Sequence, residues 1–425
     1  MAKPMRSLPE WLTHIESLDP SRIELGLDRI RAVWDRLKVG PIEAKVITVT
    51  GTNGKGTCCT ALDCILRHSG AKVGRYTSPH IREFNERIMI NGEMAISTDL
   101  LDAFERVESA REKTDLTYFE FTTLVCLDLF QRSELDYWVL EVGLGGRLDA
   151  VNVVDADLAV VTSVGLDHMD WLGETLHAVA QEKAGIFREG IPVVLGQANL
   201  PAVMKRKASE LNCQVFQNTQ QWEAYQETTI GKPTGWSWQG KCSAGKLKLL
   251  TELPYHQLNL DSLGCAVQAA YLINPELTDS AVLLGIEYTQ LRGRWEVVHN
   301  SKGVEIVLDV AHNPAAGFAL RGTLKQNPVV GKTFCVLGML NDKQHMDFIG
   351  EIAPVVDTWF LTNPGGSRSW DVQQIQESLL PQALVFPTPE LALANAVTRA
   401  REGDRVLVTG SFLTVEAVMD SEFLQ

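Results

Sequence analysis

Short apolar runs alternate along the chain with segments whose apolar positions recur at helical spacing. Val46–Thr50, Leu158–Val164 and Pro192–Leu195 are runs that predict buried strands. Thr57–His68 and Phe119–Phe130 instead place apolar residues on a helical face. Further strands are predicted at Val73–Tyr76 and Tyr137–Val142. Strands that alternate with helices predict a mostly parallel sheet covered on both faces.

Two regions depart from this alternation. Residues 7–38 are predicted to be helical, because Ser7 and Glu10 match a capping box and apolar residues recur at helical spacing. Residues 201–255 are polar and predict short antiparallel strands at the edge of the domain. Residues 262–289 return to a helical pattern.

The strand and helix alternation starts again after Arg294. Further strands are predicted at Val304–Val310, Thr333–Leu337, Trp359–Thr362 and Arg405–Thr409. We therefore predict an α/β protein of two domains. Residues 1–293 would form a domain with a mostly parallel sheet and an edge antiparallel segment. Residues 294–425 would form a smaller Rossmann-like α/β domain.

Composition narrows the range of partners and locations. The chain has 39 Lys and Arg against 53 Asp and Glu, a net charge of −14, which argues against nucleic acid as a partner. Its 8 cysteines form no CxxC pair, so buried reduced thiols in a cytosolic protein are favoured over a zinc site or disulfides. The chain start has no apolar signal core, and no run approaches a membrane span. We expect a cytoplasmic monomer that binds no membrane.

A glycine-rich loop joins the strand Val46–Thr50 to the next predicted helix. It consists of Gly51, Thr52, Asn53, Gly54, Lys55, Gly56 and Thr57. A strand, a glycine turn and a helix N-terminus together present backbone N–H groups to an anion. Lys55 would contact the outer phosphates of ATP, and Thr57 would place its hydroxyl on Mg²⁺. The spacing departs from the common P-loop because Gly56 separates Lys55 from Thr57.

Two further strand ends carry candidate metal ligands. Glu141 closes an apolar strand, where an unpartnered carboxylate would be costly, so a metal ion or a neighbouring cation is expected beside it. His168 lies between Asp167 and Asp170 just past another strand, which favours a metal ligand over a structural histidine. Taken by itself, Lys183 is interpreted as a solvated charge on a helix.

The second domain has its own candidates at strand ends. Asp309 and His312 follow one apolar strand, and Ser411 follows another. Loops at the carboxyl ends of parallel strands line the crevice of such sheets, so these residues are plausible binding positions. Arg294 lies at the domain junction, where its guanidinium could bind a phosphate.

Together these motifs resemble the folylpolyglutamate synthase and dihydrofolate synthase family, relatives of the muramyl-peptide ligases. The resemblance covers nearly the whole chain. The motifs that occur in the family's order are Gly51–Thr57, Tyr76–His80, Glu141–Asp149, Leu166–His168, Glu182–Phe187 and Asp309–Pro314. The opening segment Ser7–Leu12 is similar to that of the bacterial bifunctional type.

The resemblance implies an ATP-dependent amide ligase. Such an enzyme adds L-glutamate to dihydropteroate and to the glutamyl tail of reduced folates through an acyl phosphate. It works with Mg²⁺ at two sites. Residues 1–293 would then be the ATP-binding, P-loop ATPase-like domain of a Mur-type ligase, and residues 294–425 would be the glutamate-binding ligase domain.

The resemblance also assigns roles to residues. Ser78, Glu141 and His168 match the magnesium ligands of the family, and Lys183 matches a lysine that is carbamylated and helps to organise the second metal. Asp149, with Arg147 in the same motif, lies where the family forms part of the pterin pocket. In the second domain Arg294, Asp309 and His312 match residues of the ATP site, and Ser411 matches the closing motif. The catalytic residues implied are Lys55, His168 and Lys183.

Two positions depart from the family pattern, and three alternatives stay open. Thr77 stands where a serine is frequent, and Ser262 stands where an asparagine helps to bind adenine, so Asn259 or a backbone group would take over that contact. The enzyme could have the polyglutamylating activity alone. It could be a muramyl-peptide ligase, although the loop begins at Gly51 and leaves no room for a preceding nucleotide-sugar domain. From a different class, it could be a P-loop switch or binding module.

Overall fold

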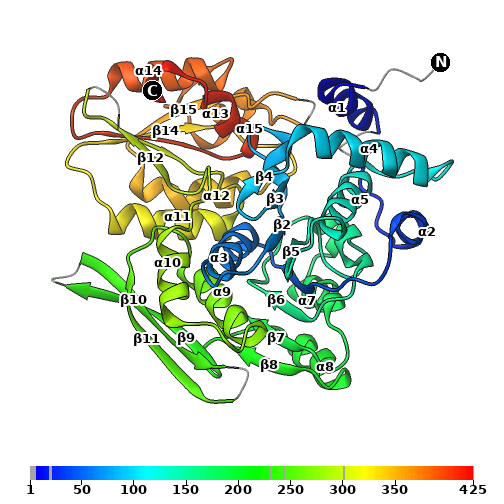
Figure 1. Ribbon diagram of the computed structural model, residues 1–425. Coiled ribbons are helices and arrows are strands. Elements are labelled where there is room, and N and C mark those ends of the chain that lie inside the picture. The colour runs from blue at the N-terminus through cyan, green and yellow to red at the C-terminus, as the bar shows by residue number, and fades with distance from the viewer. Residues whose placement is uncertain are drawn as a thin grey trace. The chain divides into compact units, whose positions relative to one another are not determined.

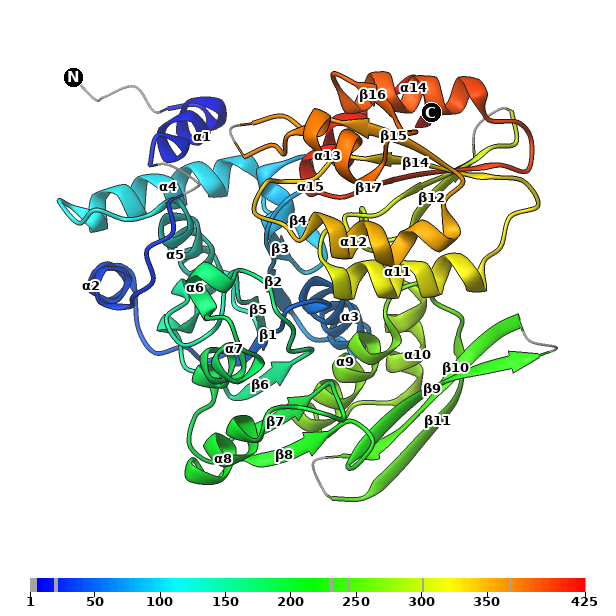
Figure 2. The same cartoon turned by 180° about the vertical axis from the view of Figure 1, so that it is seen from behind.

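The computed structural model describes residues 6–18, 22–229, 232–242, 245–299, 302–366 and 368–424 (Figures 1 and 2). The chain divides into two compact units. Unit 1 comprises Met1–Thr228 and Thr234–Thr289, and unit 2 comprises Thr229–Pro233 and Gln290–Gln425. Each unit contains a predominantly parallel sheet with helices, which confirms the predicted α/β class.

Unit 1 is built on a sheet of 8 strands in the order β4-β3-β2-β5-β1-β6-β7-β8. All neighbours from β2 to β8 are parallel, whereas β3 and β4 add an antiparallel edge. The central strands are almost entirely buried and mostly apolar, because helices cover both faces of the sheet. The strands are β1 (Lys45–Thr50), β2 (Val73–Tyr76), β3 (Ile88–Ile90), β4 (Glu93–Met94), β5 (Tyr137–Glu141), β6 (Leu158–Val161), β7 (Pro192–Leu195) and β8 (Gln214–Gln217).

The helices of unit 1 pack in two layers. Helices α3, α9 and α10 contact one another on one face of the sheet, and α3 also contacts β1, β2 and β5. Helices α1, α2, α4 and α5 share a core with residues of β1 and β5, while α7 and α8 cover β6 and β7. Their bounds are α1 (Leu8–Glu16), α2 (Asp28–Leu37), α3 (Lys55–His68), α4 (Ser97–Arg111), α5 (Tyr118–Gln131), α6 (Met169–Leu172), α7 (Leu176–Lys183), α8 (Ala202–Glu210), α9 (Leu260–Ile273) and α10 (Asp279–Glu287).

The opening region is less helical than residues 7–38 predicted. The capping box of Ser7 and Glu10 is present, with the Ser7 backbone N–H donating to the Glu10 carboxylate over 2.7 Å. However, residues 22–27 form a connection without regular structure between α1 and α2. Apolar residues alternate with polar ones there at a period of two, which does not support a helical face.

The region 201–255 contains more than antiparallel strands. It begins with α8 and with β8, which joins the parallel sheet. The remaining strands form a separate 3-stranded sheet in the order β11-β10-β9, with β10 and β11 antiparallel. Their bounds are β9 (Trp222–Thr229), β10 (Lys232–Lys241) and β11 (Leu247–Pro254).

Unit 2 has a 6-stranded sheet in the order β12-β13-β17-β14-β15-β16, parallel except for β12. The four predicted strands are present, and β12 and β16 extend the edges. The strands are β12 (Glu296–His299), β13 (Glu305–Leu308), β14 (Thr333–Leu337), β15 (Thr358–Thr362), β16 (Leu384–Phe386) and β17 (Arg405–Thr409). The helices are α11 (Pro314–Gln326), α12 (His345–Ile352), α13 (Val372–Leu379), α14 (Pro389–Arg399) and α15 (Phe412–Val418).

Five short 3-10 helices complete the described structure. They are η1 (Phe84–Arg87), η2 (Ala150–Val153), η3 (Ala184–Ile186), η4 (Ala353–Val355) and η5 (Glu422–Leu424). Within the described residues, no helix is both long and apolar enough to cross a membrane.

Candidate active site

The glycine loop connects β1 to α3 at the carboxyl end of the large sheet. Gly54 is the N-cap of α3 and has a left-handed backbone with φ 85°, which glycine adopts without steric cost. Lys55 is the first residue of α3, and its Nζ donates to the Gly51 carbonyl over 3.0 Å. The helix N-terminus and the Lys55 ammonium therefore lie on one short loop, as anion binding requires.

Residues after the neighbouring strand β6 hold this loop in place. The Asn53 carbonyl accepts from the Thr162 hydroxyl at 2.7 Å and from the Ser163 hydroxyl at 2.9 Å. The Thr52 hydroxyl makes two hydrogen bonds with Gly165: it donates to the Gly165 carbonyl and accepts from the Gly165 N–H. The sequence analysis did not identify Thr162 and Ser163, because a hydroxyl after a strand carries no signal of what it faces.

Helix α9 approaches the loop from its other side. A Cβ atom at Gly54 would collide with the Ser262 hydroxyl, so Ser262 packs directly against the loop. Ser262 is committed to the cap of its own helix, since its N–H and its hydroxyl both donate to Asn259 Oδ1, at 2.9 and 2.8 Å. The side-chain oxygen Oδ1 of Asn259 is thus already used by the two hydrogen bonds of the helix cap.

Glu141 closes β5 next to β1 and is only 4% exposed. Its Oε2 accepts from the Ser78 backbone N–H over 3.2 Å, which brings together two of the predicted magnesium ligands. Thr57, in the first turn of α3, is 4% exposed. These groups supply the hard oxygen donors that Mg²⁺ and Mn²⁺ prefer.

Asp149 belongs to the segment that follows β5 and is 2% exposed. Its carboxylate accepts from the Leu144 N–H at 2.8 Å and the Val151 N–H at 3.0 Å. Burial raises the pKa of Asp149 to about 6, against the opposing effect of these N–H groups and of Lys55. Arg147 of the same segment is half exposed and binds Glu182 Oε1 at 2.9 Å.

Lys183 is buried, so the interpretation of this residue as a solvated helix charge is wrong. Its side chain is 2% exposed at the end of α7, where the helix packs on the sheet. Burial lowers the pKa of Lys183 to about 7, and Lys55 lowers it further, while Asp167 and Asp149 oppose the change. At neutral pH a substantial fraction of this amine is therefore unprotonated and nucleophilic, which is the chemical requirement for reaction with carbon dioxide.

His168 lies at the surface, as the N-cap of α6 with a left-handed φ of 50°. Its backbone N–H donates to Asp167 Oδ1 at 2.9 Å. In the described part of the chain, no group of three or more His, Cys, Asp and Glu side chains is arranged to hold a metal ion. An ion bound by Glu141 or His168 would therefore need hydroxyl, phosphate or water oxygens to complete its coordination.

In unit 2 the four predicted site residues gather near the carboxyl ends of β13 and β17, which are adjacent parallel strands. They are Arg294, Asp309, His312 and Ser411. Asp309 accepts from the N–H groups of Trp295 and Ala311, both at 2.9 Å, and desolvation raises its pKa while Arg294 opposes this. The Arg294 guanidinium lies 5.0 Å from the ring centre of Phe412, which follows Ser411.

His312 joins the same cluster through Phe412, whose ring centre is 6.2 Å away. Its Nδ1 lies 2.8 Å from the Val310 carbonyl, and because a carbonyl only accepts, Nδ1 carries the proton. Ser411 is the N-cap of α15 and accepts from the Thr414 N–H at 3.1 Å. Unit 2 therefore holds a guanidinium, a carboxylate and an imidazole together at the carboxyl end of its sheet.

A polar pocket of about 380 Å³ lies at the N-terminus of α9 in unit 1. The exposed Asp261 lines it at the N-terminus of α9 and accepts from the Asn218 amide at 2.9 Å. Gln197, Asn199 and Glu223 also line the pocket. The sequence analysis did not identify Asp261, because it placed the expected base contact one residue later, at Ser262.

Comparison with known proteins defines the class of this site. Residues 49–238 match the Mur ligase middle domain, and residues 293–412 match the Mur ligase glutamate ligase domain. The phosphate loop and the buried Glu141 fall in the first of these, and the Arg294, Asp309 and His312 cluster falls in the second. The domains and the fold are those of the Mur-type, ATP-dependent ligases.

Relatives over the full length give the family. The chain is 38% identical to the dihydrofolate synthase/folylpolyglutamate synthase of Escherichia coli K12, over 97% of this chain and 95% of the relative. It is 37% identical to that of Haemophilus influenzae, over 96% of both chains. The chain belongs to the family of bifunctional dihydrofolate synthase/folylpolyglutamate synthases, which confirms the resemblance drawn from its motifs.

Solved structures share the fold and carry ligands. Escherichia coli FolC in complex with DHPP and ADP matches with a TM-score of 0.90 at 37% identity, over 99% of this chain and 98% of that one. A bifunctional folylpolyglutamate synthase/dihydrofolate synthase with Mn, AMPPNP and L-glutamate bound matches with a TM-score of 0.88 at 39% identity, over 97% of each chain.

Proposed function

We propose that this protein uses ATP to join L-glutamate to dihydropteroate and to the glutamyl tail of reduced folates. The observation that carries the proposal is the phosphate loop, with Lys55 at a helix N-terminus and the buried Glu141 on the adjacent strand. The family of the chain supports the same conclusion. Residues 1–293 are assigned ATP binding, and residues 294–425 are assigned the ligase domain that binds glutamate.

The chain's own groups account for activation of the substrate carboxylate. Lys55 and the N–H groups at the start of α3 bind the outer phosphates and offset charge as the γ-phosphoryl group moves to the carboxylate. The glutamate amine then attacks the acyl phosphate, a tetrahedral intermediate forms, and phosphate leaves. Arg294 is assigned a phosphate contact and His312 a nucleotide contact from the second domain.

Thr57, Ser78, Glu141 and His168 are assigned to two magnesium sites. A divalent ion held there would neutralise phosphate charge and orient the γ-phosphoryl group. The closely spaced Glu141 and Ser78 support this assignment. Removal of the Glu141 carboxylate would take away the negative charge among these ligands, and the divalent ion would bind more weakly.

Lys183 is assigned as a carbamylated lysine. The neutral amine would attack carbon dioxide, so that a nitrogen–carbon bond forms, one proton leaves, and the side chain becomes an anion. Its pKa of about 7 supports this, because an unprotonated amine is then abundant at neutral pH. Lys55 is close enough to influence the pKa of Lys183, and it would offset the charge of the carbamate.

Asp149 and Arg147 are assigned to the pterin end of the acyl substrate. The Asp149 carboxylate is buried, which suits a hydrogen bond to a ring N–H group. The adenine is assigned to the pocket lined by Asp261 and Asn218. The closing motif at Ser411 and the expectation of a cytoplasmic monomer complete the proposal.

The test is ADP release measured with ATP, L-glutamate and either dihydropteroate or tetrahydrofolate. We expect both acceptors to support glutamate-dependent ADP release. Release with tetrahydrofolate alone would indicate the polyglutamylating activity only. A muramyl-peptide ligase or a P-loop switch would show no glutamate-dependent ADP release with either acceptor, and that result would overturn the proposal.

The variant Lys55→Ala tests the phosphate loop directly. We expect kcat/KM for ADP release to fall by at least about a hundredfold, because a charge beside the transferred group is lost. Lys205→Ala, an exposed lysine of α8, serves as the matched control and should leave kcat/KM unchanged. Near-normal turnover of Lys55→Ala would refute the phosphate role, provided that both variants retain the wild-type melting temperature.

A further inference from the structure

Arg294 of unit 2 lies between two residues whose backbone is left-handed. Gly293 has a φ of 62° and Trp295 a φ of 45°. Glycine adopts this conformation freely, whereas a bulky residue rarely does, because its Cβ atom comes too close to a carbonyl oxygen. Such a backbone persists only where the surrounding structure holds it. The turn around Arg294 is therefore set by the contacts of Trp295 and not by local preference.

The backbone on both sides of the arginine is hydrogen-bonded to the segment that ends β13. The Trp295 N–H donates to Asp309 Oδ2 over 2.9 Å, and the Gly293 carbonyl accepts from the Val310 N–H over 2.9 Å. The Gly293 N–H donates to Glu296 Oε2 over 2.8 Å. Because β12 is paired with β13, a change of φ at Trp295 would turn the peptide group before it away from Asp309. The left-handed backbone and this hydrogen bond therefore depend on each other.

The indole of Trp295 is anchored in the core of unit 2. Trp295 is 5% exposed and belongs to the apolar cluster that also contains Val307 of β13 and Leu324 of α11. The Arg405 guanidinium lies over the indole, 5.2 Å from the ring centre, where a cation is attracted to the ring face. Within the described part of the chain, the buried indole Nε1 has no hydrogen-bond partner. The ring is therefore held by packing and by Arg405, and not by its N–H group.

Arg405 is itself fixed, which makes it a firm support for the indole. It is 2% exposed and forms an ion pair with Glu305, its direct partner in the pairing of β13 with β17. Its Nη2 also donates to the Asn327 carbonyl over 2.6 Å. A buried guanidinium with two such partners has little freedom to move, because its donors lie in one rigid plane.

The side chain of Arg294 does not follow the indole into the core. Arg294 is partly exposed, and its guanidinium lies over the ring of Phe412, 5.0 Å from the ring centre. Its Nη1 donates to the Gly293 carbonyl over 3.2 Å. The turn that Trp295 anchors therefore decides where the charge of Arg294 lies among the site residues of unit 2.

We propose that Trp295 is a positioning residue for ATP, because its anchored, left-handed backbone holds the Arg294 guanidinium beside Phe412. This inference rests on the proposed function, in which Arg294 contacts a phosphate. Trp295 itself touches neither ATP nor the acyl substrate. It acts on nucleotide binding through Arg294 alone, which separates it from a residue that only stabilises unit 2.

A double-mutant cycle between Trp295 and Arg294 tests this inference. The readout is the Kd of AMPPNP with Mn²⁺, measured by isothermal titration calorimetry. We expect Trp295→Ala to raise this Kd about tenfold, and Arg294→Ala to raise it at least as much. In the Arg294→Ala background, Trp295→Ala should change the Kd by less than about twofold, because the residue that it positions is absent. Trp295→Phe should stay within about threefold of wild type, since phenylalanine keeps an aromatic face on Arg405.

Leu324→Ala is the matched control, because it removes apolar volume from the same core cluster without touching the turn. It should lower the melting temperature and leave the Kd within about twofold of wild type.

Trp295→Gly tests the backbone of the turn. Glycine adopts a left-handed conformation without steric cost, so Trp295→Gly should melt at no lower a temperature than Trp295→Ala. A clearly lower melting temperature of the glycine variant would indicate an ordinary backbone at this position and would refute the inference.

The outcomes distinguish this inference from the proposed function. If the wild type binds AMPPNP but shows no glutamate-dependent ADP release, the proposed function fails and the coupling of Trp295 to Arg294 can still be measured. If the wild type does not bind AMPPNP, both fail. An unchanged Kd in Trp295→Ala would refute the inference alone. An equal rise with and without Arg294, or a similar rise in Leu324→Ala, would also refute it, since either indicates general loosening of unit 2.

Discussion

Lys183 shows how far a single residue depends on its surroundings. A lysine at the end of a short helix is ordinarily solvated, but α7 packs its last turn against the sheet and leaves Lys183 2% exposed. Burial disfavours the ammonium form, and nearby Lys55 disfavours it further. The free energy of unfolding is therefore lower whenever the buried amine is protonated.

The lowered pKa of Lys183 sets the direction of a pH dependence. Its pKa falls from 10.5 to about 7, so between these values the unfolded chain binds more protons than the folded protein. The free energy of unfolding therefore rises with pH across this window, and its Lys183 contribution is lost as pH falls to about 7. Lys183→Met should remove that part of the slope.

Lys183→Met should also have a higher free energy of unfolding than the wild type at pH 7, by on the order of 2 kcal/mol, because methionine carries no charge that must be buried. Denaturant unfolding in metal-free buffer without carbon dioxide, at several pH values, measures both effects. Lys205→Met is the control and should keep the wild-type slope. A Lys183→Met protein with the wild-type slope would mean that Lys183 is solvated or paired in solution.

For single residues, the sequence predicted which side chains are candidates for the site better than it predicted how deeply each side chain is buried. The glycine loop, Glu141, Asp309 and His312 were identified because their types follow apolar strands in recognisable motifs. The burial of Lys183 could not be predicted, because it depends on which strands α7 covers. For the same reason, the hydroxyls of Thr162 and Ser163 became meaningful only once β6 was placed beside β1.

Among the secondary-structure elements, the N-terminus of α9 both packs against the glycine loop and lines a pocket, within four residues. Asn259 caps the helix and Ser262 packs on Gly54, so the helix start is fixed against the phosphate loop. Asp261 lies between them and lines the neighbouring pocket. A helix held so firmly at its cap gives Asp261 a defined position in this pocket, which we propose holds the nucleotide base.

Asp261 gives a prediction about nucleotide choice. The amino group of adenine donates to a carboxylate, whereas the corresponding oxygen of guanine is an acceptor that a carboxylate repels. Asp261→Asn supplies an amide that can serve either base. We expect the ratio of kcat/KM for ATP over GTP to fall about tenfold in Asp261→Asn.

Glu223→Gln is the control for charge at the same pocket and should change the ATP over GTP ratio less than Asp261→Asn. Steady-state ADP and GDP release measure the two ratios. An unchanged ratio in Asp261→Asn would place the base elsewhere.

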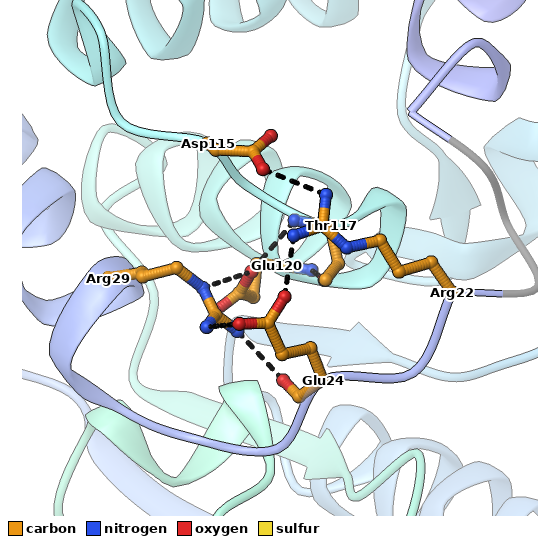
Figure 3. A network of polar contacts seen from close by, with 6 residues as sticks. All are labelled: Arg22, Glu24, Arg29, Asp115, Thr117 and Glu120. Atoms are coloured by element: carbon orange, nitrogen blue, oxygen red, sulfur yellow. Dashed lines mark hydrogen bonds and ion pairs between the residues drawn. The ribbon is translucent and has the colours of Figure 1, made fainter.

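Elements with strong periodicity were predicted well, and irregular ones were not. The parallel strands and α3 and α5 follow from apolar runs and helical spacing. The break between α1 and α2 was missed, because residues 22–27 are fixed by side-chain contacts to α5 and not by local preference. In Figure 3, Arg29 of α2 joins Glu24 of this connection to Glu120 of α5. The separate sheet of β9, β10 and β11 was predicted only as antiparallel strands, since pairing partners are not encoded locally.

For the whole molecule, the two units have separate hydrophobic cores. Unit 1 contains one core around α1, α2, α4 and α5 and another around α7 and α8. Unit 2 has cores on both faces of its own sheet. Each unit has the buried apolar content of an independent folding unit, so the chain is not expected to unfold in a single step.

We expect two transitions in calorimetric unfolding. AMPPNP with Mn²⁺ at about 100 times its Kd should stabilise the unit 1 transition by ~2.7 kcal/mol. Lys55→Ala should lose this stabilisation, because the phosphates lose their cation. Hydrogen exchange of β1 and β17 assigns each transition to its unit. A single transition in which β1 and β17 lose protection together would show that the units unfold as one.

The position of β1 in its sheet has a consequence for synthesis of the chain. β1 pairs with β5 and β6, which end at Glu141 and Val161, whereas the phosphate loop begins at Gly51. At ~5–20 residues per second, the loop leaves the ribosome on the order of ten seconds before its supporting strands exist. During that interval an apolar strand is unpaired, so the growing chain is open to aggregation and to capture by chaperones until β5 and β6 have been made.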